Sequence, residues 1–554
     1  MATESPGVAT ETRPTDVGLR RELGLIGATW ASETSIIGSG WLFAPLFAAL
    51  LVGAASILAW IVAGVIIILL ALCHAELGAM YPVSGGTARF PHFAFGSVAG
   101  IGFGFFAYMQ AVTIAPVECF AFMNYASYFW PSLYDHTTGN VTGTGFALTI
   151  VLMAVFVAVN FLAMRIFARV NNVITWWKVA IPILAIIVLL ANGVHGSNFS
   201  AGGFMPGGLH GLFSALVGGS IIFAYSGFEQ CDQLAGEIKN PGRNLPLAII
   251  ISVLIGTAIY TLLEVAFVGA MPPALLAHGW LKFSDAAITA GPFAGLAAAV
   301  GLGWLASLLR VDAFVSPSGT GLIYTTGTSR VSYGLARNRY APQMFGRVSN
   351  NGIPWVGLIG AFLIGLLFLL PFPSWHSLVS LITGASVLMY AGAPLSLGAF
   401  RGQVPDASRP YRLPWAKVLA PLAFVVAGLL IYWSGFEVVW KLGVVLVIGY
   451  VVLGTTMAFD KQRPPLDWKN ALWLPAWLIG LGIISWQGQY SGGAVAAPLN
   501  TNNIPFWWDM VVVAGFSIII YYWAMRTKLT RAEMLNLVNR QSGEQELPDS
   551  GVHH

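Results

Sequence analysis

Charged side chains inside long apolar stretches are the residues of this chain best suited to do chemistry. The ones that matter most are Glu33, Glu118, Lys178, Arg310 and Asp312. A charge near the centre of a bilayer costs about 2.5–3.5 kcal/mol on insertion scales, so a charge retained there usually binds or moves something. Some of these residues must neutralise one another, and Asp312 suits that role because it follows Arg310 by two positions. The others predict a site for a charged solute or a proton.

Lys178 is the most informative of these residues. It lies in the segment NNVITWWKVAIP, inside an apolar stretch at about 172–192. Lys178 lies roughly six residues from the inner end of this stretch. A lysine whose amine reaches the headgroups would lie closer to the end. We therefore expect Lys178 to be buried, where loss of hydration disfavours the ammonium form. This placement predicts a lysine that exchanges a proton near neutral pH and so switches a site between charged and neutral.

Two of the apolar stretches are interrupted in matching places. The first, at about 23–47, contains Gly38-Ser39-Gly40, and the second, at about 212–234, contains FAYSGFE at 223–229. Unwound backbone is tolerated in a membrane only where it is buried or lines a cavity. A pair of interrupted spans in corresponding places of two halves points to the binding site of a transporter. Close packing of helices through small residues is the alternative interpretation.

The composition predicts an all-α polytopic membrane protein. The 554 residues are 56% hydrophobic and 9% charged, whereas soluble domains carry about 25% charged residues. A helix needs about 20 apolar residues to cross a bilayer, and about fourteen stretches of the chain qualify. Their approximate limits are 23–47, 54–80, 97–130, 146–165, 172–192, 211–234, 246–270, 293–323, 354–371, 376–399, 415–434, 438–458, 470–487 and 507–525.

The distribution of basic residues predicts the orientation. With the N-terminus in the cytoplasm, all but four of the 27 Lys and Arg residues fall in cytoplasmic loops or tails. Lys282 and Lys441 would lie outside, and Lys178 and Arg310 lie within spans. The positive-inside rule then places both termini in the cytoplasm.

Six sequence motifs resemble those of a known transporter family. They are IIGSGWLFAP (36–45), AELGAMYPVSGGTARFPHF (75–93), PVE (116–118), FAYSGFE (223–229), AGEIKNPGRNLP (235–246) and TSRVSYGLARNRYAP (328–342). With these motifs the chain resembles the amino acid–polyamine–organocation transporters, most of all bacterial permeases of the aspartate–proton symporter type. The last four predicted spans carry no such motif.

The resemblance implies the LeuT-type fold, in which two inverted repeats of five helices have their first and sixth helices broken at the substrate. It implies a ten-helix core at 21–400 and four additional helices at 401–526. Cytoplasmic tails at 1–20 and 527–554 would flank them.

The resemblance also assigns residues to the site. Ile37, Gly38, Ser39 and Gly40 would bind a substrate carboxylate, because free N–H groups at the start of a half-helix attract anions. The carbonyl groups of Phe223 and Ser226 would accept from an α-ammonium group, and the Phe223 ring would cover the substrate. Lys178 falls where proton-coupled members carry a lysine in place of a sodium ion, and segment 312–318 would face it.

These assignments predict a secondary amino-acid transporter of the cytoplasmic membrane. Its partners would be an amino acid, protons and the lipid bilayer, with proton coupling at Lys178, Asp312 and Glu33. An acidic substrate such as aspartate or glutamate would need a cation for its side chain, and Arg310, expected near the middle of the eighth span, could supply it. A small zwitterionic amino acid is also compatible with the predicted site. Glu33 and Glu118 could instead hold a cationic amino acid or polyamine.

Other classes of protein fit the sequence less well. A channel gives no reason for paired breaks and a buried lysine. A sensor that binds without transport would share the site, and only a flux measurement separates the two. The sequence contains no HExxH, P-loop or GxSxG motif, so we expect no enzyme. We expect no cofactor, bound metal or nucleic-acid partner, and the sequence leaves the oligomeric state open.

Overall fold

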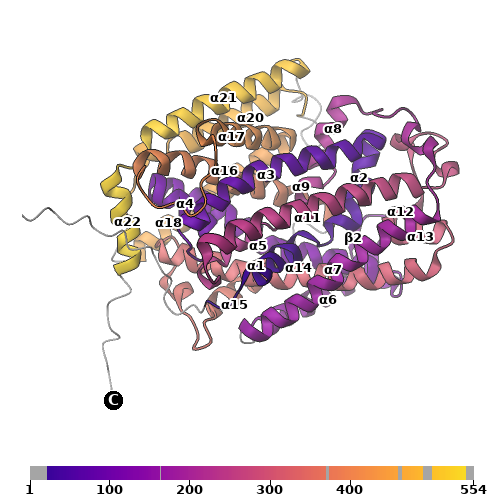
Figure 1. Cartoon of the computed structure of the whole chain (residues 1–554), viewed down its shortest axis with the longest axis horizontal. Helices are drawn as coiled ribbons and strands as arrows, with labels where there is room; N and C mark the ends of the chain where they lie inside the picture. Colours follow the sequence, from indigo (N-terminus) through magenta and orange to yellow (C-terminus); the bar gives the residue numbers. More distant parts are fainter. Residues whose placement is uncertain (1–20, 162–163, 370–373, 460–463, 491–501, 544–554) are drawn as a thin grey trace, which may run out of the picture.

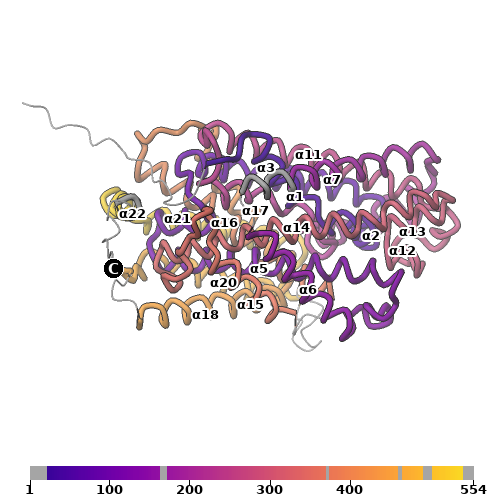
Figure 2. The backbone as a smooth tube through the Cα atoms, turned by 90° about the horizontal axis from the view of Figure 1, so that it is seen from below, coloured from indigo at the N-terminus to yellow at the C-terminus, as the bar shows by residue number. Residues whose placement is uncertain are grey.

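A computed structural model describes residues 21–161, 164–369, 374–459, 464–490 and 502–543. Most long helices run side by side along the long axis of the molecule (Figures 1 and 2). The first seven helices are α1 (Leu25–Ile36), α2 (Gly40–Val52), α3 (Ser56–Met80), α4 (Gly86–Phe95), α5 (Ser97–Ala126), α6 (Gly143–Asn160) and α7 (Met164–Asn192). Between α5 and α6, strands β1 (Tyr134–Asp135) and β2 (Asn140–Val141) form a small antiparallel hairpin in which Tyr134 is opposite Val141.

The remaining helices follow in two groups. The middle group is α8 (Gly208–Val217), α9 (Ile221–Ala224), α10 (Gln230–Gln233), α11 (Pro241–Ala270), α12 (Ala286–Ala290), α13 (Pro292–Ala299), α14 (Gly303–Arg337), α15 (Trp355–Leu369) and α16 (Trp375–Gln403). The last group is α17 (Ala416–Trp433), α18 (Phe436–Phe459), α19 (Trp468–Ala471), α20 (Trp473–Gln487), α21 (Phe506–Thr527) and α22 (Arg531–Gly543). Short 3₁₀ helices lie at 53–55, 131–133, 196–200, 235–237, 273–276, 280–282 and 343–346.

The described helices confirm the prediction of an all-α polytopic membrane protein. Nine helical segments among them are long and apolar enough to cross a membrane, and two shorter apolar segments lie at Gly208–Ala224 and Trp355–Leu369. Val65, Ile187 and Val447 are each more than half exposed on the outer faces of such helices. Exposed apolar side chains of this kind face lipid rather than water. The count of fourteen spans and the inverted repeats stay predictions.

Both predicted interruptions are present. The first break separates α1, which ends at Ile36, from α2, which begins at Gly40. The second interruption is double: α8 stops at Val217, α9 has only four residues, and α10 begins at Gln230. Ser220, with φ 65°, adopts the left-handed conformation between α8 and α9. Phe223 therefore lies in a short helix, and the predicted unwinding at 223–229 is confined to 225–229.

The positions of two charged residues differ from the prediction. The predicted eighth span at 293–323 is split between α13 and α14 around Gly301, whose φ of 81° ends the helix. Arg310 therefore lies about two turns from the N-terminal end of α14, so the prediction that it lies mid-span was wrong. Lys178 lies halfway along the 29-residue α7, deeper than expected.

The C-terminal helices pack along one side of the bundle. Helices α17, α20 and α21 contact one another, α17 packs on α16, and α18 packs on α5 (Figure 1). The last described helix, α22, contacts α4. Just before α22, the Leu529 N–H donates to the Ala94 carbonyl oxygen at 3.1 Å. The boundaries predicted at 20, 400 and 526 stay predictions.

Candidate functional site

The two broken segments meet face to face in the interior. A Cβ atom added to Gly40 would lie 2.8 Å from both Cα and Cβ of Ala224. A Cβ atom added to Gly227, which has φ 137°, would lie 2.5 Å from the backbone nitrogen of Ile36. Only glycine lets these backbones approach so closely. The sequence thus breaks both segments at the place where each must fit against the other.

The carbonyl groups left free at the end of α1 are capped by other helices. The Lys178 ammonium group donates to the Thr34 carbonyl oxygen at 2.5 Å and to the Thr320 hydroxyl at 2.7 Å. The Thr320 hydroxyl in turn donates to the same Thr34 carbonyl at 2.8 Å, and the Tyr260 hydroxyl donates to the Ile36 carbonyl at 2.6 Å. A helix end buried without such partners would be unstable. Lys178 therefore joins the first break to α14.

The N-terminal end of α2 carries an acidic partner. Glu118 of α5 accepts from the Ser39 N–H at 2.9 Å, and the Ser39 side chain accepts from the Trp375 indole N–H at 2.9 Å. A carboxylate is stabilised there by the free N–H groups and dipole of the helix. Glu118 and Thr320 both approach Gly38, since an added Cβ would lie 2.7 Å and 2.8 Å from their oxygen atoms.

A narrow cavity of about 10 Å³ lies between the two breaks, α5 and α14. Five residues predicted from the sequence line it, namely Gly38, Gly40, Glu118, Phe223 and Ser226. Two other predicted residues do not line the cavity but bind residues that do. The Ser39 N–H donates to Glu118, and the Ile37 carbonyl oxygen accepts from the Thr320 hydroxyl at 3.5 Å. Six further lining residues were not predicted, namely Ser35, Ile36, Ile114, Ala224, Thr320 and Tyr324. This volume holds about one water molecule, so an amino acid can bind here only after the walls move apart.

Phe223 and Ser226, whose carbonyl groups were expected to bind an ammonium group, both form hydrogen bonds within the second break. The Phe223 carbonyl oxygen already accepts from the Ser226 N–H at 3.0 Å, so it offers one remaining lone pair. The Ser226 hydroxyl donates to the Ile222 carbonyl oxygen at 3.3 Å, which turns it back along its own segment. Phe223 also contributes its ring, which packs edge-on against Trp375 at 5.7 Å between centroids.

An aromatic layer covers one side of this cavity. The Trp375 ring, at the start of α16, lies 4.8 Å from the Phe43 ring in addition to its contact with Phe223. Trp375 is 3% exposed. The indole N–H bond to Ser39 fixes the ring against the break. A solute could enter or leave on this side only after the layer moves.

The opposite side of the second break is held by Glu229. Its carboxylate accepts from the Gly227 N–H, the Gln110 amide, and the hydroxyls of Tyr324 and Tyr390, at 2.8, 2.9, 2.8 and 2.9 Å. These donors come from α5, α14 and α16 as well as from the break itself. A buried carboxylate with four donors is well satisfied. Glu229 thus joins the second break to three surrounding helices.

The remaining predicted residues lie around the cavity or away from it. Asp312 is buried and accepts from the Trp177 indole N–H and the Ser316 hydroxyl, each at 2.9 Å. Both Glu33 carboxylate oxygens are buried, and neither has a hydrogen-bond partner within the described part of the chain. An uncompensated buried carboxylate is costly, which keeps Glu33 a candidate proton carrier. That segment 312–318 faces Lys178 stays a prediction. Gly319 and Thr320, just beyond this segment, contact Lys178, and Asp312 interacts electrostatically with it.

Arg310 lies outside the central cavity. Its guanidinium carbon stacks 3.8 Å from the centroid of the Tyr128 ring, and it lines a separate chamber. Asp312 does not neutralise it, contrary to the suggestion from spacing, because the Asp312 oxygens bind Trp177 and Ser316 instead.

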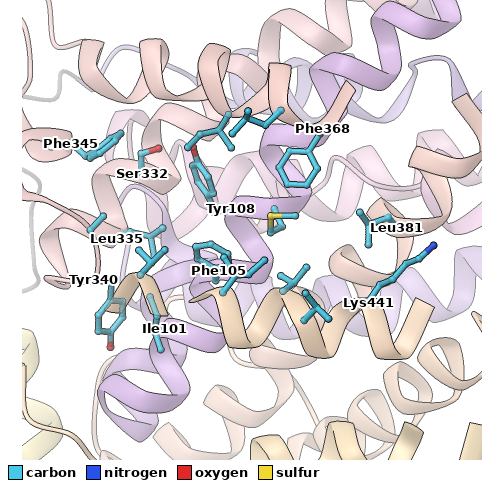
Figure 3. A pocket seen from close by; sticks show the side chains of 18 of the residues that line it. Ile101, Phe105, Tyr108, Ser332, Leu335, Tyr340, Phe345, Phe368, Leu381 and Lys441 are labelled. Carbon is cyan, nitrogen blue, oxygen red and sulfur yellow. The ribbon is translucent and has the colours of Figure 1, made fainter. Parts of the chain in front are cut away.

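A further cavity, lined mostly by apolar side chains, is unsuited to an amino acid. It measures about 590 Å³ and lies between α5, α14, α15, α16 and α18 (Figure 3). The side chains that point into it are mostly aliphatic or aromatic, such as Phe105, Leu335 and Phe368 (Figure 3). Hydrocarbon walls cannot replace the water that a zwitterion loses on binding.

One sequence signal could have identified the missed residues of α14. Polar residues recur there at every fourth position, namely Asp312, Ser316, Thr320, Tyr324, Thr328 and Ser332. Residues four apart are neighbours on a helix, so this row predicts a polar ridge that winds slowly around an apolar segment. No comparable signal marks Trp375, whose role depends on tertiary packing. Among the described residues, no cluster of His, Cys, Asp and Glu could hold a metal ion.

Comparisons with known proteins agree with this geometry. A family model described as amino acid permease matches residues 23–457. The chain is 35% identical to the glutamate/serine transporter AimA of Bacillus subtilis (strain 168) over 520 residues, which cover 92% of this chain and 94% of the relative. It is 36% identical to the aspartate-proton symporter of the same strain over 506 residues, 90% and 95% of the two chains. The branched-chain amino acid permease BcaP of that strain is 26% identical over 447 residues, 78% and 92%.

Proposed function

Since the chain belongs to the amino acid permease family, we propose that it is a secondary transporter that moves an amino acid together with a proton across the cytoplasmic membrane. The protein is a multi-pass membrane protein and not an enzyme. The similar aspartate-proton symporter supports coupling to protons, and the similar glutamate/serine transporter supports an acidic or small polar substrate.

One observation carries the proposal: the Lys178 ammonium group binds the end of α1 beside the cavity. A cation at this place holds together the first break and α14, as a bound metal ion would do. A lysine can lose its charge by releasing a proton, and the two hydrogen bonds then weaken because they are no longer charge-assisted. Proton release from Lys178 would thus loosen α1 from α14, and proton binding would restore the contact.

The substrate would bind at the start of α2. Its carboxylate would replace Glu118 as the acceptor of the Ser39 N–H, and the displaced Glu118 would pair with the substrate ammonium group. This exchange leaves no charge unpaired, which matters in a site that excludes water. The Phe223 carbonyl group, with its one remaining lone pair, would accept from the same ammonium group.

A cationic amino acid or polyamine fits this arrangement poorly. Among the described residues that line the central cavity, Glu118 is the only carboxylate, and it would serve the α-ammonium group. A second cation would then have no acidic partner in the cavity. The names of the similar glutamate/serine transporter and aspartate-proton symporter support an acidic or small polar substrate.

Access would alternate between the two sides of the cavity. The aromatic layer of Phe43, Phe223 and Trp375 would open toward one side, and the contacts of Glu229 would open toward the other. Substrate and proton would each shift the balance between these states by differential binding.

Uptake into proteoliposomes tests the proposal. The purified protein is reconstituted, and uptake of labelled aspartate, glutamate, serine, lysine and putrescine is measured with an inward pH gradient, an inward sodium gradient, or neither. We expect concentrative uptake of the acidic amino acids or serine with the pH gradient only, abolished by a protonophore. Uptake that needs sodium and ignores the pH gradient would contradict the proposal. Binding without flux would indicate a sensor. Flux that needs no gradient and does not saturate with substrate would indicate a channel.

A further inference from the structure

We propose that the chamber beside Arg310 is an outer binding site that selects amino acids with a side-chain carboxylate before they reach the central cavity. This inference rests on the proposed function. The chamber measures about 150 Å³ and lies between the C-terminal end of α5, the hairpin loop, α13 and the start of α14. With the N-terminus in the cytoplasm, these parts all lie on the outer side, where a substrate arrives.

Arg310 offers this chamber a cation with no acidic partner. Within the described part of the chain it forms no ion pair or hydrogen bond, and its guanidinium group stacks on Tyr128 at 3.8 Å. No Asp or Glu is among the residues that line the chamber. Stacking orients the planar guanidinium group and leaves its N–H edge free for a carboxylate, which it can hold at two points.

Two buried polar atoms complete the chamber. The Asn124 side-chain oxygen and the Tyr125 hydroxyl are both buried, and neither has a hydrogen-bond partner among the described residues. Asn124 is 9% exposed and Tyr125 is 4% exposed, and both line the chamber. Such orphaned groups are uncommon, because each costs free energy unless a solute or water satisfies it. An amide oxygen accepts from an ammonium group, and a phenol donates to a carboxylate, so both suit an amino acid.

The chamber contains one further titratable group, His136. Its Nε2 atom lies 2.8 Å from the Ser127 hydroxyl oxygen, so it already has a partner. The inner walls are formed by small residues of α12, α13 and the turn between them, such as Gly291 and Ala294. An added Cβ at Gly291 would lie 3.2 Å from the Tyr125 ring. The absence of side chains on this wall leaves room for a solute beside Arg310.

The position of the chamber links it to the central cavity. Tyr125 follows Glu118 by seven residues on α5, so it lies two turns, about 10 Å, farther out on the same face. The Tyr125 ring contacts Phe43 at 5.5 Å between centroids, and Phe43 in turn contacts Trp375 at 4.8 Å. The aromatic layer thus separates the chamber from the cavity. A carboxylate held by Arg310 would wait directly outside the layer.

Kinetics with two substrates test this site. Uptake of labelled aspartate and labelled serine is measured in proteoliposomes for the unmutated protein, Arg310→Gln, Arg310→Lys and the control Lys282→Gln. The control removes an exposed outer-side cation that does not line the chamber. We expect Arg310→Gln to raise the KM for aspartate about tenfold, as fits the loss of a two-point charged contact, and to change kcat little. Arg310→Lys should restore part of the loss, and serine kinetics should stay unchanged in every variant.

Two further results decide between the site and a structural role. Tyr125→Phe keeps the ring and removes only the hydroxyl, so it should raise the KM for aspartate without lowering the thermal unfolding temperature. Equal losses for aspartate and serine in Arg310→Gln, or equal effects of Arg310→Gln and Lys282→Gln, would overturn the proposal. Absence of proton-driven uptake for every amino acid in the unmutated protein would instead overturn the proposed function. Normal uptake with an unaltered aspartate KM in Arg310→Gln would overturn only the outer site.

Discussion

The side-chain nitrogen of Lys178 lies 2.7 Å from the hydroxyl oxygen of Thr320, in a part of the protein where both residues are buried. Lys178 comes from α7 and Thr320 from α14. The pair is tied to the end of α1 because both residues donate to the Thr34 carbonyl oxygen. One ammonium group and one hydroxyl thus hold three helices together at the first break.

Removing this hydroxyl should weaken the contact without changing the shape of the core. Thr320→Val replaces the hydroxyl by a methyl group, so Lys178 loses an acceptor and Thr34 loses a donor. Leaving a buried charged donor less satisfied costs about 1–3 kcal/mol. We expect a lower thermal unfolding temperature in detergent and a shifted pH dependence of uptake. Thr320→Ser keeps the hydroxyl and should behave nearly like the unmutated protein; equal behaviour of Val and Ser variants would remove Thr320 from the account.

A side chain at Gly40 should separate the two breaks. Gly40→Ala brings a Cβ within 2.8 Å of Ala224, where backbone must move to make room. Overpacking of this kind costs about 1–3 kcal/mol, and we expect at least tenfold weaker substrate binding in equilibrium measurements. Gly443→Ala in α18 is the matched control, because a Cβ there meets no atom within 4 Å. Unchanged affinity in a folded Gly40→Ala protein would show that the close approach is not needed for binding.

Neutralising Glu229 should disrupt the second break. Glu229→Gln replaces one acceptor oxygen by an NH₂ group, which is a donor. This donor would face other donors, including the Gly227 N–H and the Tyr390 hydroxyl. Tyr390→Phe removes only one donor, which is worth about 1 kcal/mol. We therefore expect thermal unfolding temperatures in the order unmutated, Tyr390→Phe, Glu229→Gln, and slow or absent uptake for the last. A Glu229→Gln protein as stable and active as Tyr390→Phe would argue against a joining role.

The breaks and much of the cavity lining could be predicted because their signals are local. Glycine and polar residues inside an apolar segment are visible in the sequence, and Gly38, Gly40, Glu118, Phe223 and Ser226 do line the cavity. Lys178 was recognisable because a charge so far from the end of a span is unusual.

The partners of these residues could not be read from the sequence, because they depend on how distant helices pack. Trp375 covers the site from the start of α16, more than 300 positions after its partner Ser39. The depth of Arg310 depends on where α14 begins. The turn at Gly301 determines that start, and the hydrophobicity of the sequence does not reveal it. Thr320 could have been found only from the four-residue polar repeat of α14.

Proton movement that accompanies substrate entry tests the central claim most directly. Proteoliposomes containing a pH-sensitive dye receive substrate from outside, and internal acidification is recorded for the unmutated protein, Lys178→Met and the control Lys441→Met. Lys441 of α18 pairs with Glu437 on the surface of the bundle, away from the breaks. We expect substrate-dependent acidification in the unmutated and Lys441→Met proteins. Lys178→Met should still bind substrate and yet produce no acidification. Full substrate-dependent acidification in Lys178→Met would contradict the claim that this lysine couples the proton to the amino acid.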